Sequence, residues 1–397
     1  MPSWHERLFP SSLKNWPQRL SFLLLAGSVS LALISIAASQ ILLAAAIAAA
    51  LMQWSNSREQ IRLPAALLAA VVALFLWTLA AMLASSGSLH DGIVRKFFLF
   101  SLLLIVPILA LGNDRLTWIY SAIFVSAGYE AVVGLVQFGI NPHRDALNRI
   151  KGLMSMWMTY SGLLMLALVA LVAYAAALGW KKHRWVVPLG LMLIAALHLS
   201  QTRSAEFGAC AGIAVILLLK RPRWLLGLLI SVLALYLASP AGVQQRLRGA
   251  WNLRDDNTRN RIEIYGTAVR LIEAHPWMGV GQKVSRVALQ YRGTQEFPDY
   301  MYLHMHNNFL QIAAERGIPG LIIWMWFMFQ LVWQGFRVFR SSGGAGSAAF
   351  IALAAIGGWF ALLAAGMFEY NFGDSEVLTL FLFVMSAPYA VRVTSQE

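Results

Sequence analysis

The sequence predicts an all-α polytopic membrane protein of about twelve transmembrane helices with one large extramembrane loop. Hydrophobic residues make up 59% of the 397 residues and charged residues only 12%, whereas about a quarter of the residues of a soluble domain are charged. Uncharged apolar runs such as 21–54, 65–84 and 97–111 recur along the chain, and a helical span needs about 20 apolar residues. Both observations exclude a soluble domain.

Apolar continuity and length set the positions of the expected spans. They are residues 21–38, 40–54, 64–84, 97–111, 116–139, 159–178, 185–200, 205–219, 224–239, 318–333, 349–366 and 376–391. The chain therefore divides into nine spans within 1–239, a large loop at 240–317, and three spans with a C-terminal tail at 318–397.

The distribution of basic residues predicts the orientation. With both chain ends in the cytoplasm, the inner segments hold fifteen Lys or Arg and the short outer loops hold six, as the positive-inside rule requires. The loop at 240–317 then faces outward. The formal charge of +13 is explained by these short inner loops, so nucleic acid is not expected as a partner. The single cysteine, Cys210, excludes an intramolecular disulfide.

Two stretches of the loop have helical signals. Asn260–Glu273 places Ile262, Tyr265, Val269 and Ile272 at helical spacing, which predicts an amphipathic helix near the bilayer surface. Near the loop's end, the spacing of apolar residues predicts a short helix with His306 on its packed side. Gly317 is expected to end that helix, because glycine suits a helix end and the following Pro319 cannot continue it.

Three motifs make a family resemblance specific. His306-Asn307, nine further residues and then Gly317-Ile318-Pro319-Gly320 resembles the signature of the O-antigen ligase family. Thr202-Arg203-Ser204 at the outer end of a span is similar to a second element, and Arg261 with Tyr265 and His275-Pro276-x-x-Gly279-x-Gly281 is similar to a third. The family belongs to a wider group with O-antigen polymerases and protein O-oligosaccharyltransferases.

The resemblance implies a GT-C-like glycosyltransferase of the bacterial inner membrane with a periplasmic active site. Its expected partners are membrane lipids, an O-antigen donor linked to undecaprenyl diphosphate, and lipid A-core, whose sugar hydroxyl accepts the glycan. Arg203 and Arg261 match positions expected to bind the diphosphate, and His306 matches the general base. The other residues expected to contact substrate are Asn307, Tyr265, Arg259 and His304.

The chemistry of these residue types suits that reaction. Arginine pairs with phosphate in bidentate geometry, and histidine can accept the proton of a sugar hydroxyl near neutral pH. Direct attack on an α-linked donor inverts the anomeric centre without a covalent enzyme intermediate. No metal and no cofactor are expected, since the sequence has no Asp-x-Asp motif and Asp255-Asp256 is typical of a solvated turn.

Each assignment has an alternative. Arg203 could be an interfacial anchor whose charged end reaches the headgroups, and Arg254 or Arg259 could replace Arg261. His306 could be a hydrogen-bonded structural histidine. His304 and His306 could ligate zinc, but residues two apart do not face each other on a helix, and the sequence indicates no third ligand.

Alternatives also remain for the whole protein. An O-antigen polymerase or a protein O-oligosaccharyltransferase would use the same donor and base. A flippase or other transporter for lipid-linked glycans is a different class, and Glu130, deep within a predicted span, could couple protons in such a protein. We favour a structural role for Glu130, because a transporter should place charges along a path through the bundle.

Overall fold

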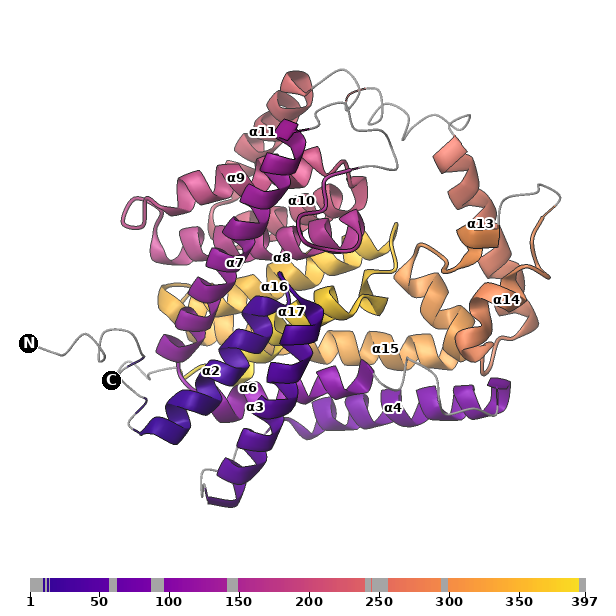
Figure 1. Cartoon of the computed structure of the whole chain (residues 1–397), viewed down its shortest axis with the longest axis horizontal. Helices are drawn as coiled ribbons and strands as arrows, with labels where there is room; N and C mark the ends of the chain where they lie inside the picture. Colours follow the sequence, from indigo (N-terminus) through magenta and orange to yellow (C-terminus); the bar gives the residue numbers. More distant parts are fainter. Residues whose placement is uncertain are drawn as a thin grey trace, which may run out of the picture.

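All regular elements in the described part of the chain are helices (Figure 1). The computed structural model describes residues 10, 13, 15–56, 63–86, 96–140, 149–239, 244, 256–293 and 299–392. Five helices are long and apolar enough to cross a membrane: α4 (Ala65–Ser86), α7 (Asn113–Ile140), α8 (Trp157–Leu178), α15 (Asn308–Ser341) and α16 (Gly346–Gly366). The predicted all-α class is therefore confirmed for the described residues, and the five candidate spans are consistent with a polytopic membrane protein.

The other predicted spans overlap the remaining helices of the bundle. They are α2 (Trp16–Leu31), α3 (Ile36–Asn56), η1 (Phe97–Ser101) with α6 (Leu102–Leu109), α9 (Val186–Leu199), α10 (Arg203–Lys220), α11 (Leu225–Ala238), and α17 (Ser375–Ser386) with η6 (Ala387–Tyr389). Since only five helices in the described residues meet the length and hydropathy needed for a full crossing, the number of twelve spans stays a prediction.

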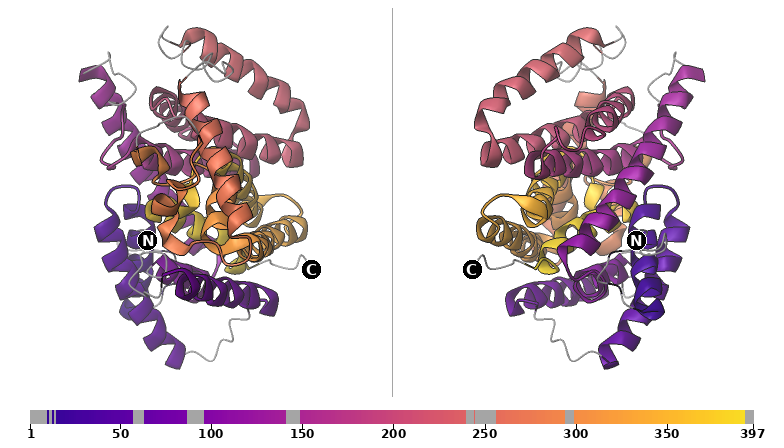
Figure 2. Two further views of the ribbon diagram at one scale, coloured as in Figure 1. Left: turned by 90° about the vertical axis from the view of Figure 1, so that its right-hand side faces the viewer. Right: turned by 90° about the vertical axis from the view of Figure 1, so that its left-hand side faces the viewer.

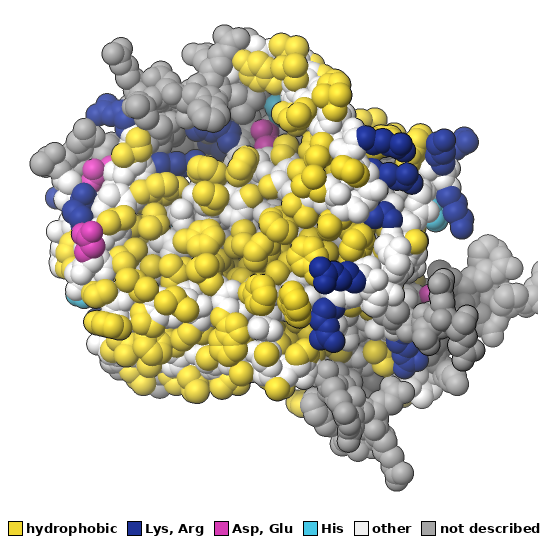
Figure 3. All heavy atoms as spheres, turned by 180° about the vertical axis from the view of Figure 1, so that it is seen from behind, with side chains coloured by type: hydrophobic (Ala, Val, Ile, Leu, Met, Phe, Trp, Pro, Cys, Tyr) yellow, Lys and Arg dark blue, Asp and Glu magenta, His cyan; other side chains and the backbone are white. Residues whose placement is uncertain are grey.

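The surface has the distribution expected of a bilayer-embedded protein. Hydrophobic side chains cover the middle of the face shown in Figure 3, and most charged side chains on that face lie toward opposite edges. Helix α11 lies at the edge of the molecule (Figure 2) and has no buried residue. It is joined to the bundle by the Oγ of Ser239, 2.6 Å from Nε2 of His198, whose Nδ1 lies 3.0 Å from the carboxylate of Glu206 on α10.

Helix α16 is the centre of the bundle, because residues 348–358 are buried on all sides. Its backbone approaches α10 closely: a Cβ added to Gly208 would lie 2.6 Å from the carbonyl oxygen of Ala361, and one added to Gly212 would lie 2.6 Å from that of Gly357. Small residues permit such packing in membranes. These contacts show that the two helices are antiparallel, so the start of α10 lies beside the end of α16.

The large loop contributes α13 (Asp256–Ala274), η3 (Gly281–Lys283), α14 (Val284–Ala288) and η4 (Asp299–Tyr302). Helices α13 and α14 lie together at one end of the molecule, beside the start of α15 (Figure 1). These elements form a small apolar core that includes Ile264, Ala268, Leu271, Met305 and Ala314. The core joins the loop to α15.

The predicted helix at 260–273 is present, and its predicted apolar face is divided, since Tyr265 and Ile272 pack against the small apolar core. Ile262 is 54% exposed and Val269 is 45% exposed, whereas Ile264, Ala268 and Leu271 are buried. Apolar residues occur on more than one side of α13, and the packing partners Val280, Met305 and Ala314 select the buried side. The spacing of apolar residues within α13 therefore cannot show which side of the helix is buried.

The predicted helix break at Gly317 is confirmed. Gly317 has φ 71° and ψ 177°, an extended conformation favoured by glycine rather than the left-handed helix cap, and α15 bends there. The turn after α13 docks onto this bend: the amide of Ile318 donates to the carbonyl of Pro276 at 2.8 Å, and the amide of Val280 donates to the carbonyl of Ala314 at 2.8 Å. Neither backbone segment can carry a bulky side chain at this contact.

Glycine is required on both sides of the contact. A Cβ on Gly317 would lie 2.0 Å from the carbonyl oxygen of Trp277, and one on Gly279, whose φ is +63°, would lie 2.5 Å from that of Ala314. These distances are far below a van der Waals contact. The two glycine motifs of the sequence are therefore two halves of one backbone contact.

Replacing Gly317 with Ala should destabilise the protein through both its positive φ and this clash. Gly343→Ala is the matched control, since Gly343 has φ +62° with nothing within 4 Å of an added Cβ. The control should cost about 1 kcal/mol, and Gly317→Ala should cost about 1–3 kcal/mol more. Thermal unfolding of the purified protein in detergent measures the difference. Equal melting temperatures for the two variants would contradict the docking contact.

Candidate active site

His306 lies in the segment between η4 and α15 and is not part of a helix, so its predicted place on a helix face was wrong. Helix α15 begins at Asn308, because Asn307 is its N-cap and its Oδ1 accepts hydrogen bonds from the amides of Phe309 at 2.8 Å and Leu310 at 3.1 Å. Asn307 therefore fixes the entry of α15 immediately after His306.

In the described part of the chain, two non-glycine residues have a positive φ: His306 at 46° and Gln201 at 54°. A non-glycine residue held in this way costs on the order of 1–3 kcal/mol, and such strain is common at functional sites. Gln201 lies two residues before Arg203, and its carbonyl accepts a hydrogen bond from Arg149 at 3.2 Å. The strain thus marks the two segments that carry Arg203 and His306.

Two histidines and a buried carboxylate form the centre of the site. Nδ1 of His306 lies 3.6 Å from Oε2 of Glu369, and Nε2 of His304 lies 4.0 Å from Oε1. The two imidazole centroids are 4.1 Å apart. The side chains are 22% exposed for His306, 32% for His304 and 12% for Glu369, so the cluster is mostly enclosed but solvent still reaches His306.

The cluster has a defined charge distribution. Burial raises the pKa of Glu369, but the hydrogen bond and charge of His306, and the charges of His304 and Arg261, outweigh burial and hold that pKa below its usual range. Burial and the charge of His306 lower the pKa of His304 to about 4, against the opposing effect of Glu369. At neutral pH the carboxylate is therefore ionised and His304 is neutral.

Helix α13 closes the site. The hydroxyl of Tyr265 lies 3.2 Å from the carbonyl oxygen of His306 and 2.9 Å from that of Met367, so its single proton is shared between them. Asn307 also donates to the carbonyl of Met367, at 2.9 Å. Arg261, one turn before Tyr265, is close enough to lower the pKa values of both Tyr265 and Glu369, although burial raises the pKa of Tyr265 overall.

Arg203 reaches the same end of the bundle through a different element. It is the first residue of α10, and the ring of Phe207, one turn later, packs edge-on against Phe368 at 5.7 Å between centroids. Phe368 directly precedes Glu369. Arg203 is half-buried, and Arg259 lies exposed on α13 two residues before Arg261.

The structure therefore brings together the predicted residues Arg261, Tyr265, His304, His306 and Asn307, and places the start of α10 beside them. Glu369 was not predicted. The only signal in the sequence was an acidic residue in Phe368-Glu369-Tyr370-Asn371-Phe372, a short connection between two apolar runs.

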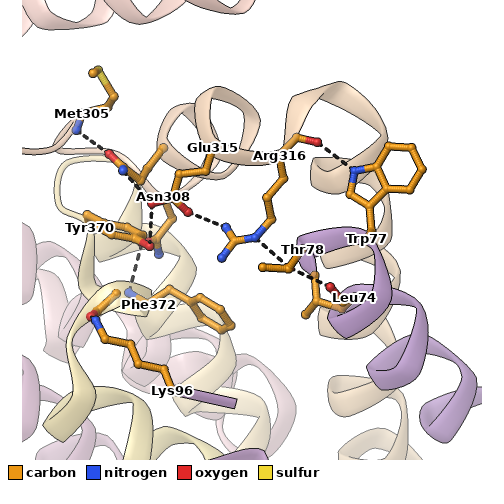
Figure 4. A network of polar contacts seen from close by, with 12 residues as sticks. Leu74, Trp77, Thr78, Lys96, Met305, Asn308, Glu315, Arg316, Tyr370 and Phe372 are labelled. Atoms are coloured by element: carbon orange, nitrogen blue, oxygen red, sulfur yellow. Dashed lines mark hydrogen bonds and ion pairs between the residues drawn. The ribbon is translucent and has the colours of Figure 1, made fainter. Parts of the chain in front are cut away.

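A buried polar network joins the first turns of α15 to the segment at 370–372 (Figure 4). The side-chain amide of Asn308 donates to Oδ1 of Asn371 at 2.6 Å, and its Oδ1 accepts from the amide of Phe372 at 3.1 Å. The hydroxyl of Tyr370 lies 3.3 Å from Oε1 of Glu315. These bonds fix the segment that contains Glu369 against the first turns of α15.

The same network reaches α4. Arg316 forms a buried ion pair with Glu315 at 2.6 Å and donates through Nε to the hydroxyl of Thr78 at 3.0 Å. The indole of Trp77 donates to the carbonyl of Arg316 at 2.8 Å (Figure 4). Since buried charges are tolerated only when they are paired and hydrogen-bonded, this arrangement holds the α15 bend in one position.

The histidine cluster must also be considered as a metal site. One ligand atom from each of His304, His306 and Glu369 lies within 4.8 Å of the others, so both reasons given above against zinc fail: the histidines are not on a helix, and a third ligand is present. However, Nδ1 of His304 accepts from the amide of His306 at 3.3 Å, which leaves the proton of neutral His304 on Nε2, the atom facing Glu369. That tautomer disfavours a metal, and metal independence stays a prediction.

Part of the chain is similar to known proteins. Residues 188–325 match the O-antigen ligase family. The expected family resemblance is thus confirmed for this region, which contains Arg203, Arg261 and His306 and ends before Glu369. A protein of Rickettsia felis named "Putative polysaccharide ligase" is 24% identical over 205 residues, which are 48% of this chain and 50% of that relative. The chain therefore spans about half the length of this relative.

The low pKa of His304 predicts a stability that falls in acid. An unfolded histidine has a pKa of about 6.5, and folded His304 has one of about 4, so between these values the unfolded chain binds a proton that the folded chain does not. Stability should fall as the pH drops through this window, before protonation of Glu369 adds its own loss below about pH 4.5.

The test compares wild type with His304→Gln. The variant should show a smaller loss of melting temperature between about pH 6.5 and 4, whereas both proteins should have flat profiles between pH 7 and 8. Thermal unfolding in detergent at a series of pH values measures this. An identical acid slope in both proteins would rule out His304 as its source.

Proposed function

We propose that this protein is an inverting, metal-independent glycosyltransferase that moves an O-antigen glycan from undecaprenyl diphosphate to a sugar hydroxyl of lipid A-core. The observation that supports this most is the meeting of His306 with Arg261 of α13 and the first turn of α10 around one buried carboxylate. A base and two arginines beside a membrane helix fit an acceptor hydroxyl and a diphosphate leaving group. The match of residues 188–325 to O-antigen ligases supports the same reaction class.

Arg203 and Arg261 bind the donor diphosphate in this scheme. When the bond between the anomeric carbon and the phosphate oxygen breaks, its electron pair stays with that oxygen, and negative charge increases there. Guanidinium groups stabilise this charge through paired hydrogen bonds. Asn307, Tyr265, His304 and Arg259 complete the proposed substrate contacts, although the hydrogen bonds of Asn307 and Tyr265 support a role in holding the site as well.

His306 acts as the general base. The acceptor hydroxyl attacks the anomeric carbon, a new carbon–oxygen bond forms, and the hydroxyl proton passes to the imidazole. The products are the inverted glycoside and undecaprenyl diphosphate. No step needs a nucleophile from the protein, a metal or a cofactor.

The same proposal sets the location. We place the protein in the bacterial inner membrane, with both chain ends in the cytoplasm. Residues 240–317 then lie in the periplasm, between the transmembrane parts 1–239 and 318–397. Membrane lipids surround it, and nucleic acid has no role.

Two alternatives use the same residues differently. An O-antigen polymerase or a protein O-oligosaccharyltransferase would share the donor and base and differ only in the acceptor. A flippase or transporter is less well supported: Glu130 on α7 is 1% exposed and accepts a hydrogen bond from the amide of Leu153 at 3.1 Å, so it anchors the segment after residue 149, as a structural residue does.

Replacing His306 with Ala should lower transfer by about 10²–10⁴-fold, because a positioned base contributes about that much. The assay supplies the purified protein, in excess chelator, with lipid-linked glycan and, in separate reactions, lipid A-core, a shorter glycan or a pilin. His183→Ala, in the distant turn between α8 and α9, is the control. Undiminished transfer by the His306→Ala variant would exclude His306 as the base. The acceptor that the wild-type protein modifies distinguishes a ligase from a polymerase or an O-oligosaccharyltransferase.

Replacing Arg203 or Arg261 with Ala should lower kcat/KM for the donor by about 10- to 100-fold, since hydrogen bonds to charged groups contribute about 1.5–3 kcal/mol. Lys should restore only part of this, because it lacks the bidentate geometry. Exposed Arg286 on α14 provides the control, Arg286→Ala. Wild-type turnover in both Ala variants would exclude these arginines from the donor site.

A further inference from the structure

We propose that Glu369 is the positioning residue of the reaction: it holds the imidazole of His306 with Nδ1 protonated and Nε2 free to accept the acceptor's proton. This inference rests on the proposed function, in which His306 is the base. Glu369 lies outside the region that matches O-antigen ligases, in the connection between α16 and η5 (Asn371–Gly373).

The first step of the argument is the direction of the imidazole. Nδ1 of His306 faces the carboxylate of Glu369 at 3.6 Å, and an ionised carboxylate can only accept. The proton of neutral His306 is therefore drawn to Nδ1, and the lone pair is left on Nε2. A histidine that acts as a base needs this tautomer, and a carboxylate on the other nitrogen is the usual means of setting it.

The second step is the charge of Glu369. Among the described residues, three groups besides His306 interact electrostatically with its carboxylate: His304 from the same segment as His306, and Arg261 and Tyr265 from α13. His304 is neutral at neutral pH, and Arg261 is a cation that favours the ionised carboxylate. Glu369 is thus a buried anion that lies between the imidazole of His306 and the cation of Arg261. When His306 takes up the proton, the carboxylate balances the new positive charge.

The third step is the rigidity of the pair. The carbonyl of Met367, two residues before Glu369, is bound by both Tyr265 and Asn307, which also contact His306 or follow it directly. Behind them, a Cβ on Gly366 would lie 2.1 Å from Nδ2 of Asn308. The two segments that carry the acid and the base are therefore joined on either side of the pair, and their separation is set by the fold.

The competing interpretation is that Glu369 only satisfies its buried surroundings. Such a role predicts lost stability upon mutation and no change in proton transfer. A positioning role predicts that Glu369→Gln keeps its stability and loses proton transfer, since Gln has the size of Glu and can fill the same space. Its neutral amide can either accept from Nδ1 or donate to it, so it no longer enforces the tautomer with Nδ1 protonated and no longer balances the charge of the imidazolium.

The test uses the full-length purified protein with lipid-linked glycan and lipid A-core. In Glu369→Gln, kcat should fall by about 10²–10⁴-fold, while KM for the donor stays within about twofold. The acidic limb of the pH profile of the remaining kcat should move to lower pH, because protonated His306 loses its balancing carboxylate. Glu369→Asp should recover at least about tenfold of the lost kcat. Glu273→Gln, which alters an exposed carboxylate of α13, should match wild type.

Two results would overturn the proposal. One is a Glu369→Gln variant with a kcat and pH profile like wild type. The other is a Glu369→Gln variant whose loss of activity is explained by a lower melting temperature alone and whose pH profile of kcat is not shifted. If His306→Ala is inactive in the same assay, either result removes Glu369 alone. If His306→Ala remains active, the proposed base itself fails.

Discussion

The site depends on one backbone-to-backbone contact, in which the turn from Pro276 to Val280 docks onto the bend between Ala314 and Ile318. This contact fixes the end of α13 against α15, and with it the distance from Arg261 and Tyr265 to His306. It uses two hydrogen bonds between main-chain groups, so its geometry depends on the absence of side-chain bulk at Gly279 and Gly317. The part of this long loop that carries Arg261 and Tyr265 is thereby held against α15.

Much of this arrangement was predictable, because its causes are local. Apolar runs gave the helices, since burial in lipid needs only continuous hydrophobic sequence. The break at Gly317 followed from its own residue and Pro319. The convergence of Arg261, Tyr265, His304, His306 and Asn307 was expected from a resemblance whose motifs are spaced along the chain. The chemical roles of these residues remain proposals.

The errors arose where the answer depends on residues far away in sequence. Spacing within α13 could not tell which of its apolar sides is buried, because Met305 and Ala314 decide that. One error is local instead: the apolar spacing after His306 predicts a helix that includes it, but Asn307 is the N-cap and the helix begins at Asn308. Glu369 was overlooked because its meaning comes only from the two imidazoles that face it.

The position of Glu369 also bears on biosynthesis. Met367, whose carbonyl anchors this acid, lies 60 residues after Asn307, beyond the whole of α15 and α16. A chain still leaving the ribosome therefore has its histidines long before it has their carboxylate. The pair can form only after α16 has been synthesised, and a truncated chain that ends within α16 lacks it altogether. The contact between His306 and Glu369 is therefore assembled late in synthesis.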